Sequence, residues 1–340
     1  MSKKNLDWSN IPFDYVVTDK RFESHWKEGA WDAGGLTDDP TMHLNECAQV
    51  LQYSQCCFEG LKAYETKDGS IVIFRPDLNA QRMYDSEKRL EIPPYDKDQF
   101  VDAVKTVVRA NADWVPPYGS GASLYIRPFV IGSGIMIGVA PSPEFTFRIF
   151  STPVGPYFKG GVRPISVMVA DSDRAAPRGT GDIKAGLNYA MSLSTVMAAH
   201  RAGFDDCIYL DPATQTTIEE ASGANIIFID KDGGLVVPKS NSILPSVTRR
   251  SLVDMAKDTL GMKVTERVVR YDEIKDFAEC GLCGTAAVIA PVYKITKGSD
   301  EIIYGSSSEI TPVLAKMRKT LTDMQVGDIP APEGWVVPVE

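Results

Sequence analysis

The stretch RGTGDIKAGLNYAMSL, residues 178–193, joins a loop with two glycines to a run with helical periodicity. Lys184 stands at the junction between Ile183 and Ala185, so its amine is expected to be partly removed from water. A lysine in such a place is suited to act as an amine nucleophile on a carbonyl compound. The alternative is a surface lysine at a helix start, and the local sequence leaves both interpretations open.

Two adjacent acids lie further along the chain, in the stretch IEEASGAN at 218–225. They precede an apolar strand. Glu219 and Glu220 either belong to a solvated turn or place one carboxylate against a protonated pyridine nitrogen, as a pyridoxal cofactor requires.

Phosphate-binding candidates are also present. Ser246, Val247 and Thr248 follow a proline at a predicted helix start, where free amides favour an anion, although a plain N-cap serine is the commoner use. The stretch GTAA at 284–287 offers a second turn of small residues with a hydroxyl group. Arg82, taken alone, is typical of a solvated charge on a helix.

Hydrophobic periodicity predicts helices and strands in irregular alternation, without the regular rhythm of a doubly wound sheet. An Asp-Gly turn at 68–69 predicts a hairpin, and a second hairpin is expected around 232–234. The helix after Lys184 is expected to bury Leu193, Val196, Met197 and His200 on one apolar face. The predicted strands are 61–66, 70–74, 123–131, 144–150, 165–170 and 207–210, and the other predicted helices are 76–90, 98–114 and one from 244 to 260.

A chain of 340 residues predicts two domains in a mixed α/β or α+β fold. The stretch PVGPYFKGGVRP at 153–164 holds three prolines and three glycines, which is typical of a connection between domains. We expect a smaller N-terminal domain at 1–159, a linker at 160–172 and a larger C-terminal domain at 173–340.

Composition excludes several classes of protein. With 44% hydrophobic and 24% charged residues the chain is typical of soluble proteins, and its net charge of -9 argues against binding nucleic acid or an anionic membrane. Six cysteines without a signal peptide or a membrane span predict free thiols in the cytoplasm.

Competing motifs fail. The glycines at 132–138 do not match a dinucleotide fingerprint, and neither a Walker loop nor a Gly-x-Ser-x-Gly elbow is present. Cys280 and Cys283 form a lone CxxC, and the three histidines lack ligand spacing, so we expect no metal site. A redox role of that cysteine pair stays open, and His200 is expected in the core rather than in catalysis.

Together these segments resemble the branched-chain amino-acid aminotransferases, the fold type IV pyridoxal-phosphate enzymes that also include D-amino-acid transaminase and aminodeoxychorismate lyase. The resemblance extends over nearly the whole chain. It rests on FEGLKAY at 58–64, FRPDLNAQRM at 74–83, SLYIRP at 123–128, GPYF at 155–158, KAGLNY at 184–189, EEASGAN at 219–225, LPSVTR at 244–249 and CGTAAVI at 283–289.

The resemblance implies a cofactor bound between the two domains and a role for each matching cofactor residue. Lys184 would carry pyridoxal 5'-phosphate as a Schiff base and move the proton, Glu220 would keep the pyridine nitrogen protonated, and Tyr189 would bond the phenolic oxygen. The matching phosphate-holding residues are Arg82, Val247, Thr248 and Thr285.

For the substrate, the resemblance implies that Tyr125 and Arg127 form the pair that accepts both an aliphatic side chain and the second carboxylate of glutamate. Ala286 would offer an amide to the α-carboxylate. The matching residues that would line the aliphatic part are Phe58, Tyr157 and Tyr189, and those that would complete the pocket across a homodimer interface are Tyr53, Ile137 and Val139.

The implied function is reversible amino transfer between L-leucine, L-isoleucine or L-valine and 2-oxoglutarate. A D-amino-acid transaminase or an aminodeoxychorismate lyase is the nearer alternative, against which the segment YIRP at 125–128 speaks. A binding protein that has lost catalysis is the more distant one. The expected partners are small molecules and a second copy of the chain, without nucleic acid or membrane.

Overall fold

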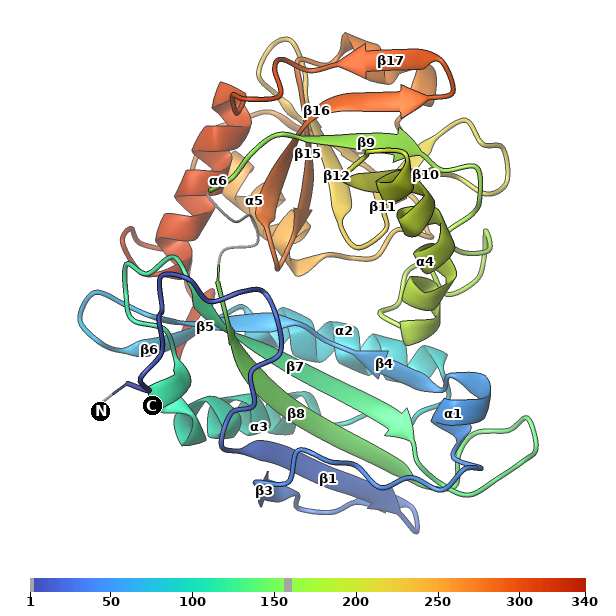
Figure 1. The fold of residues 1–340 in the computed structure, drawn as a ribbon, viewed down its shortest axis with the longest axis vertical. Helices are drawn as coiled ribbons and strands as arrows, with labels where there is room; N and C mark the ends of the chain where they lie inside the picture. Colours follow the sequence, from blue (N-terminus) through green and yellow to red (C-terminus); the bar gives the residue numbers. More distant parts are fainter. Residues whose placement is uncertain (1–2, 156–160) are drawn as a thin grey trace. The chain divides into compact units, whose positions relative to one another are not determined.

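The computed structural model describes residues 3–155 and 161–340, and these residues divide into two compact units. The first unit comprises residues 3–155 together with Ile183–Gly186 and Asp323–Glu340, and the second comprises residues 161–182 and Leu187–Thr322. Each unit combines a sheet with helices (Figure 1), so the predicted mixed α/β class is confirmed. The first unit therefore takes two segments from far along the chain.

The sheet of the first unit is antiparallel throughout the described residues. Its strands run in the order β18-β6-β5-β7-β8-β1-β2, with β3 paired to β1 and β4 paired to β7. The strands are β1 (Arg21–Lys27), β2 (Ala30–Trp31), β3 (Gly35–Thr37), β4 (Cys56–Phe58), β5 (Leu61–Glu65), β6 (Ile71–Phe74), β7 (Ser123–Gly132), β8 (Phe145–Val154) and β18 (Val336–Pro338). The predicted hairpin is β5 and β6.

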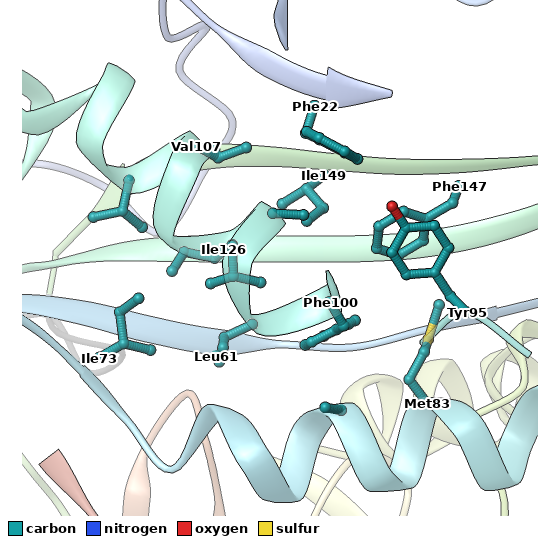
Figure 2. Packing of buried hydrophobic residues seen from close by; sticks show 14 of the residues in the cluster. Phe22, Leu61, Ile73, Met83, Tyr95, Phe100, Val107, Ile126, Phe147 and Ile149 are labelled. Atoms are coloured by element: carbon teal, nitrogen blue, oxygen red, sulfur yellow. The ribbon is translucent and has the colours of Figure 1, made fainter. Parts of the chain in front are cut away.

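Two helices, α2 (Pro76–Arg89) and α3 (Lys97–Ala110), pack on this sheet. The short helix α1 (Gln49–Tyr53) contacts β7, and the 3-10 helix η1 (Ala112–Trp114) follows α3 in the chain. Asp96 caps α3, since its carboxylate accepts the amides of Asp98 and Gln99. The apolar stripe of α3 meets the inward side chains of β7 and β8 (Figure 2), where Phe147 and Ile149 are fully buried. Hydrophobic burial of this kind is the main stabilising contribution to the unit.

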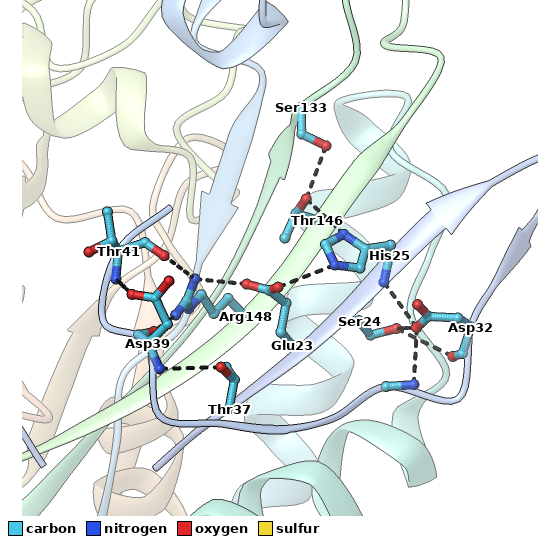
Figure 3. A network of polar contacts seen from close by, with 11 residues as sticks. Glu23, Ser24, His25, Asp32, Thr37, Asp39, Thr41, Ser133, Thr146 and Arg148 are labelled. Carbon is cyan, nitrogen blue, oxygen red and sulfur yellow. Dashed lines mark hydrogen bonds and ion pairs between the residues drawn. The ribbon is translucent and has the colours of Figure 1, made fainter. Parts of the chain in front are cut away.

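On the opposite face of β8, the polar residues Thr146, Arg148 and Thr152 are also buried. Arg148 Nη1 donates to Glu23 Oε2 at 2.7 Å and to the carbonyl oxygen of Thr41 at 3.1 Å, and Nη2 donates to the carbonyl oxygen of Asp39 (Figure 3). The register pairs Glu23 with Arg148, which brings the two charges together. Arg148, which the alternation along β8 would turn toward water, is thus covered by the chain around residues 39–41.

The sheet of the second unit closes on itself. Its strands run in the order β11-β10-β9-β16-β15-β12-β13-β14, and β12 also pairs with β11, which completes a ring of strands. In addition, β17 pairs with β16. The strands are β9 (Ile165–Val169), β10 (Asp206–Leu210), β11 (Ile218–Ala221), β12 (Asn225–Ile229), β13 (Leu235–Pro238), β14 (Val264–Arg267), β15 (Glu279–Gly284), β16 (Val288–Lys297) and β17 (Asp300–Ile303).

The helices that lie wholly or mainly in this unit are α4 (Gly186–Arg201), α5 (Val247–Asp258) and α6 (Pro312–Gln325), with the turn η2 (Tyr271–Asp276). Glu279 caps α6, because its carboxylate accepts the amides of Val313 and Leu314 at 3.0 and 2.8 Å. The predicted helices after Lys184 and after Pro245 are therefore present.

The buried face of α4 differs from the predicted one. Its buried residues are Asn188, Ser192, Thr195 and Ala199, whereas Leu193 and Met197 are 62% and 49% exposed. Small side chains allow the helix to approach the sheet around Tyr209, which a row of leucine and methionine would prevent.

His200 is likewise exposed and donates from Nε2 to the carbonyl oxygen of Asp205 at 3.0 Å. Its expected place in the core is wrong, because the last turn of α4 presents this side chain to water.

The expected linker range, 160–172, includes β9, which pairs in parallel with β10 and β16. Ile165, Val167 and Val169 are buried in the core of the second unit. Residue 160 itself lies outside the described residues. Among the described residues from 161 onward, regular structure therefore begins at Ile165, inside the range expected for the linker.

Candidate functional site

Lys184 lies in the first unit, on a short extended segment beside β4. Its amide donates to Ser86 Oγ at 3.1 Å, and its carbonyl oxygen accepts the amide of Phe58 at 3.1 Å. An isolated antiparallel bridge between Cys57 and Ala185 continues this pairing. The half-buried side chain places Nζ 4.8 Å from the centroid of the Phe58 ring. The amine is therefore fixed against an apolar ring by backbone bonds on both sides.

The same ring contacts a second cation. Arg127 Cζ lies 4.7 Å from the Phe58 centroid and 5.3 Å from that of Tyr125, and Arg127 Nη2 donates to Tyr125 Oη at 3.0 Å. Arg127 Nε is a buried donor without a partner among the described residues. The side chains of Tyr125 and Arg127 lie next to each other because the two residues are two positions apart on β7 and therefore point to the same face of the sheet.

A glycine makes this arrangement possible. A Cβ atom on Gly60 would lie 2.1 Å from Tyr125 Oη. Only a residue without a side chain fits there while Tyr125 keeps its bond to Arg127.

Arg82, on α2, is buried rather than solvated. Its Nε and Nη2 donate to Glu59 Oε1 and Oε2, each at 2.7 Å, with side chains 7% and 0% exposed. Asn79 Nδ2 also donates to Glu59 Oε2 at 2.7 Å. This bidentate geometry fixes the plane of the guanidinium group.

Glu220 lies in the second unit, on β11, and is 3% exposed. Its Oε1 pairs with Arg174 Nη2 and accepts the amide of Leu244 at 2.9 Å, and its Oε2 accepts Asn225 Nδ2 at 2.6 Å. Burial raises the pKa of Glu220 to about 7, against the lowering effects of the Arg174 guanidinium and the Leu244 amide. A solvated turn is therefore excluded for this acid.

The amides of Val247 and Thr248 open α5. Ser246 is the N-cap, and its Oγ accepts the amide of Arg249 at 3.2 Å. The plain N-cap use of Ser246 is confirmed. The amides of Val247 and Thr248, which precede Arg249 in the first turn, have no acceptor within the helix and are suited to bind an anion. Both Val247 and Thr248 are buried.

The remaining predicted cofactor and substrate residues of the second unit are half-buried. Thr285 and Ala286 lie in the turn between β15 and β16, and Tyr189 lies in the first turn of α4. The loop before Lys184 is held to this helix, because Asn188 Nδ2 donates to the Thr180 carbonyl oxygen at 2.6 Å and its Oδ1 accepts Thr180 Oγ1 at 2.7 Å.

The residues expected at a dimer interface are exposed. Ile137 and Val139 are 81% and 84% exposed on the loop after β7, and Tyr53 is 45% exposed. Tyr53 Oη donates to the carbonyl oxygen of Ile137 at 2.8 Å. The structure thus brings these three together on one surface of the first unit. Tyr157, expected in the pocket, lies outside the described residues.

Four residues of these sites were missed from the sequence. Glu59 stands inside the quoted segment FEGLKAY, next to a glycine, and an acid between apolar residues was the available signal. Asn225 stands in the quoted segment EEASGAN, five residues after Glu220, but its contact with that acid crosses a strand pair. Ser86 and Arg174 carry no local signal, since each acts on a residue distant in sequence.

Cys280 and Cys283 are buried on β15, and burial raises the pKa of the Cys283 thiol to about 12. None of the described residues forms a group of three or more His, Cys, Asp or Glu side chains able to hold a metal ion. In residues 3–155 and 161–340, no helix has the length and hydropathy needed to cross a membrane.

Comparison with known proteins agrees with this chemistry. The sequence profile of the family described as "Amino-transferase class IV" matches residues 56–295. The chain therefore belongs to the class IV aminotransferases.

Its relatives narrow the assignment. A branched-chain-amino-acid aminotransferase of Haemophilus influenzae is 52% identical, with 99% of this chain and 100% of the relative covered. One of Helicobacter pylori is 45% identical over 99% of this chain and 98% of the relative. The predicted resemblance to the branched-chain amino-acid aminotransferases is confirmed.

Solved structures confirm the predicted fold type. The branched-chain amino acid aminotransferase of Escherichia coli superposes with a TM-score of 0.80 at 27% identity, covering 95% of this chain and 100% of that one. The fold is also shared with the branched-chain amino acid aminotransferase of Thermobaculum terrenum in its PLP form. That structure gives a TM-score of 0.79 at 24% identity, with 96% of this chain and 100% of that one covered.

Proposed function

We propose that this protein is a pyridoxal-phosphate-dependent branched-chain-amino-acid transaminase. It transfers the amino group reversibly between L-leucine, L-isoleucine or L-valine and 2-oxoglutarate. The observation that carries this is the Phe58 ring, which is contacted by the Lys184 amine at 4.8 Å and by the Arg127 guanidinium at 4.7 Å. An amine nucleophile beside an apolar ring suits an aliphatic side chain, and the cation suits the second carboxylate of glutamate.

The donors and acceptors of the chain fit this cofactor. Glu220 is buried and retains an acceptor position on Oε2, which suits a protonated pyridine nitrogen. Val247 and Thr248 offer amides at a helix N-terminus for a phosphate, and Arg82 and Thr285 complete the proposed phosphate set. We assign Lys184 as the covalent attachment point and Tyr189 as the partner of the phenolic oxygen.

Bound pyridoxal phosphate supplies an electron sink that stabilises negative charge at the substrate Cα. The residues of the chain do the rest. Lys184 takes the Cα proton and returns a proton at the cofactor C4′, while Glu220 holds the ring nitrogen protonated. Arg127 and Tyr125 orient the substrate side chain, and the Ala286 amide orients the α-carboxylate.

The first test is the absorbance spectrum of the purified protein before and after L-leucine, with D-alanine in parallel. We expect a cofactor band that changes with L-leucine alone. A response to D-alanine alone would assign the protein to the D-specific relatives. A protein that shows no band after reconstitution with pyridoxal phosphate would contradict the proposal.

Lys184→Ala tests the catalytic assignment directly. We expect loss of all measurable transamination in this variant, because both the attachment point and the proton carrier are removed. Lys294→Ala, which removes a partly exposed ion pair with Glu301, is the matched control and is expected to retain activity. More than a trace of turnover in Lys184→Ala would disprove the assignment.

We further propose a homodimer whose partner covers Tyr53, Ile137 and Val139. Their exposure, together with the hydrogen bond from Tyr53 Oη to the Ile137 carbonyl oxygen, supports a role of this surface as an interface with a second copy of the chain. Val139→Asp is expected to shift sedimentation toward the monomer, whereas Ile303→Asp, at a residue 55% exposed in the second unit, is not. The cytoplasmic location stays a prediction from the six free cysteines.

A further inference from the structure

Arg174 is a buried cation with no role in the assignments above. It follows β9 in the second unit and is 5% exposed. Its Nη2 donates to the carbonyl oxygens of Gly181 at 2.5 Å and Ser242 at 3.1 Å, and pairs with Glu220 Oε1. One guanidinium group therefore joins the loop before Lys184, the loop before α5 and the acid of β11.

The contact between the two loops is close. A Cβ atom on Gly181 would lie 2.3 Å from the carbonyl oxygen of Ser242. Ser242 is held in turn by Glu219, whose Oε1 accepts the hydroxyls of Ser242 and Ser240. The loops that surround Arg174 are thus held in place by contacts of their own. Arg174 Nε is a buried donor without a partner among the described residues.

The acceptor positions of Glu220 are nearly filled. A carboxylate offers about four acceptor sites. Oε1 uses its sites on Arg174 and the Leu244 amide, and Oε2 uses one on Asn225. The bonds to Arg174, Leu244 and Asn225 leave one direction on Oε2 for a further donor, so they also fix where that donor must stand.

Four ionisable groups face Glu220 from the surrounding elements. Arg174 and Arg249 lower the pKa of Glu220, and Glu219 raises it. The Cys283 thiol on β15 is neutral at physiological pH, because burial raises its pKa to about 12. Burial outweighs the cations, and Arg174 is the cation in direct contact. Among the groups that oppose the effect of burial, Arg174 lowers the pKa of Glu220 the most.

We propose that Arg174 is a positioning residue, which favours the ionised form of Glu220 and aims its Oε2 at the pyridine nitrogen of the cofactor. This inference rests on the proposed function for the identity of that nitrogen. The charge state of Glu220 in the free protein, however, does not depend on any cofactor. The cofactor-free protein therefore allows a test that does not depend on a measurement of enzyme activity.

The test is an infrared titration of the cofactor-free full-length protein. The protonated-carboxyl band of Glu220 is isolated by subtracting the spectrum of Glu220→Gln at each pH. Arg174→Gln retains a donor for the loop carbonyls but removes the charge, whereas Arg174→Lys retains the charge. Arg267→Gln is the matched control, since Arg267 pairs with Glu273.

We expect Arg174→Gln to raise the midpoint of this titration by about one pH unit or more, and Arg174→Lys to restore most of the shift. Arg267→Gln should leave the midpoint unchanged. The affinity for pyridoxal phosphate, measured by fluorescence, should fall at least about tenfold in Arg174→Gln and recover in Arg174→Lys.

An unchanged midpoint in Arg174→Gln, or an equal shift in Arg174→Lys, would overturn the inference and assign Arg174 to loop structure alone. The proposed function fails separately, if the wild-type protein does not respond to L-leucine. If the wild-type enzyme is active but Arg174→Gln leaves the titration midpoint of Glu220 unchanged, only the role of Arg174 is refuted.

Discussion

Glu59 and Arg82 form a buried ion pair whose stability contribution can be separated from catalysis. Glu59→Gln leaves the Arg82 charge without its bidentate partner, so we expect the cofactor-free protein to lose about 3–5 kcal/mol of unfolding free energy. Urea unfolding measures this. Glu273→Gln breaks the half-exposed pair with Arg267 and should cost less than about 1 kcal/mol. Equal losses in the two variants would contradict the importance of burial.

Glu220 gives the protein a pH-dependent stability. Its pKa is raised from 4.5 to about 7, so the folded state binds one more proton than the unfolded state between these values. Stability is therefore greatest below about pH 4.5 for this group and falls as the pH rises through 7, by on the order of 3 kcal/mol.

The measurement is urea unfolding of the cofactor-free wild type and of Glu220→Gln at a series of pH values. Asp206 and Glu87, whose pKa values burial also raises, remain in both proteins, so the difference isolates Glu220. The wild type should lose stability relative to the variant as the pH rises. A difference independent of pH would show that Glu220 does not titrate in this range.

At the scale of the element, α4 is the sharpest test of packing. Ala199→Leu inserts a large side chain on the buried face and should cost about 1–3 kcal/mol. Leu193→Gln, on the exposed face, should change the unfolding free energy by less than about 0.5 kcal/mol. Thermal unfolding measures the loss of stability in each variant. A larger loss in Leu193→Gln than in Ala199→Leu would show that the buried face is the one that the periodicity predicted.

This helix also shows where sequence reasoning succeeds and where it stops. The predicted hairpin is present as β5 and β6, because an Asp-Gly turn and alternating side chains are local properties. The faces of α4 were misassigned. Periodicity shows which apolar residues share a face, but it does not show that a sheet with bulky side chains packs against the face with small residues. Lys184 and Glu220 were candidates from the local sequence, and the resemblance implied their roles. Glu59 carried only the signal of an acid between apolar residues, and Arg174 became visible only through its partners.

At the scale of the whole molecule, the first unit is not a contiguous stretch of chain. β18 pairs with β6, and Arg75 donates its amide to the Trp335 carbonyl oxygen at 2.7 Å while its guanidinium stacks on the Trp335 ring. A fragment of residues 1–159, the predicted N-terminal domain, lacks this strand and the segment around Lys184. We expect it to show no cooperative unfolding transition by circular dichroism.

Adding residues 323–340 through a flexible linker should restore part of that transition, because β18 and the buried Val339 return to the sheet. Fully cooperative unfolding of the 1–159 fragment would show instead that β18 is dispensable. The domain boundary at 159 stays a prediction until this is measured, since long-range strand pairing leaves no mark in local sequence.

The placement of β18 also has a consequence for synthesis on the ribosome. Residues 71–74 leave the exit tunnel early and residues 336–338 late, so the edge of β6 stays without its final neighbour through most of translation. An unpaired edge is a template for association with other chains. The nascent chain is therefore expected to need protection by a holding chaperone during elongation, and slow translation should lower the yield of native enzyme.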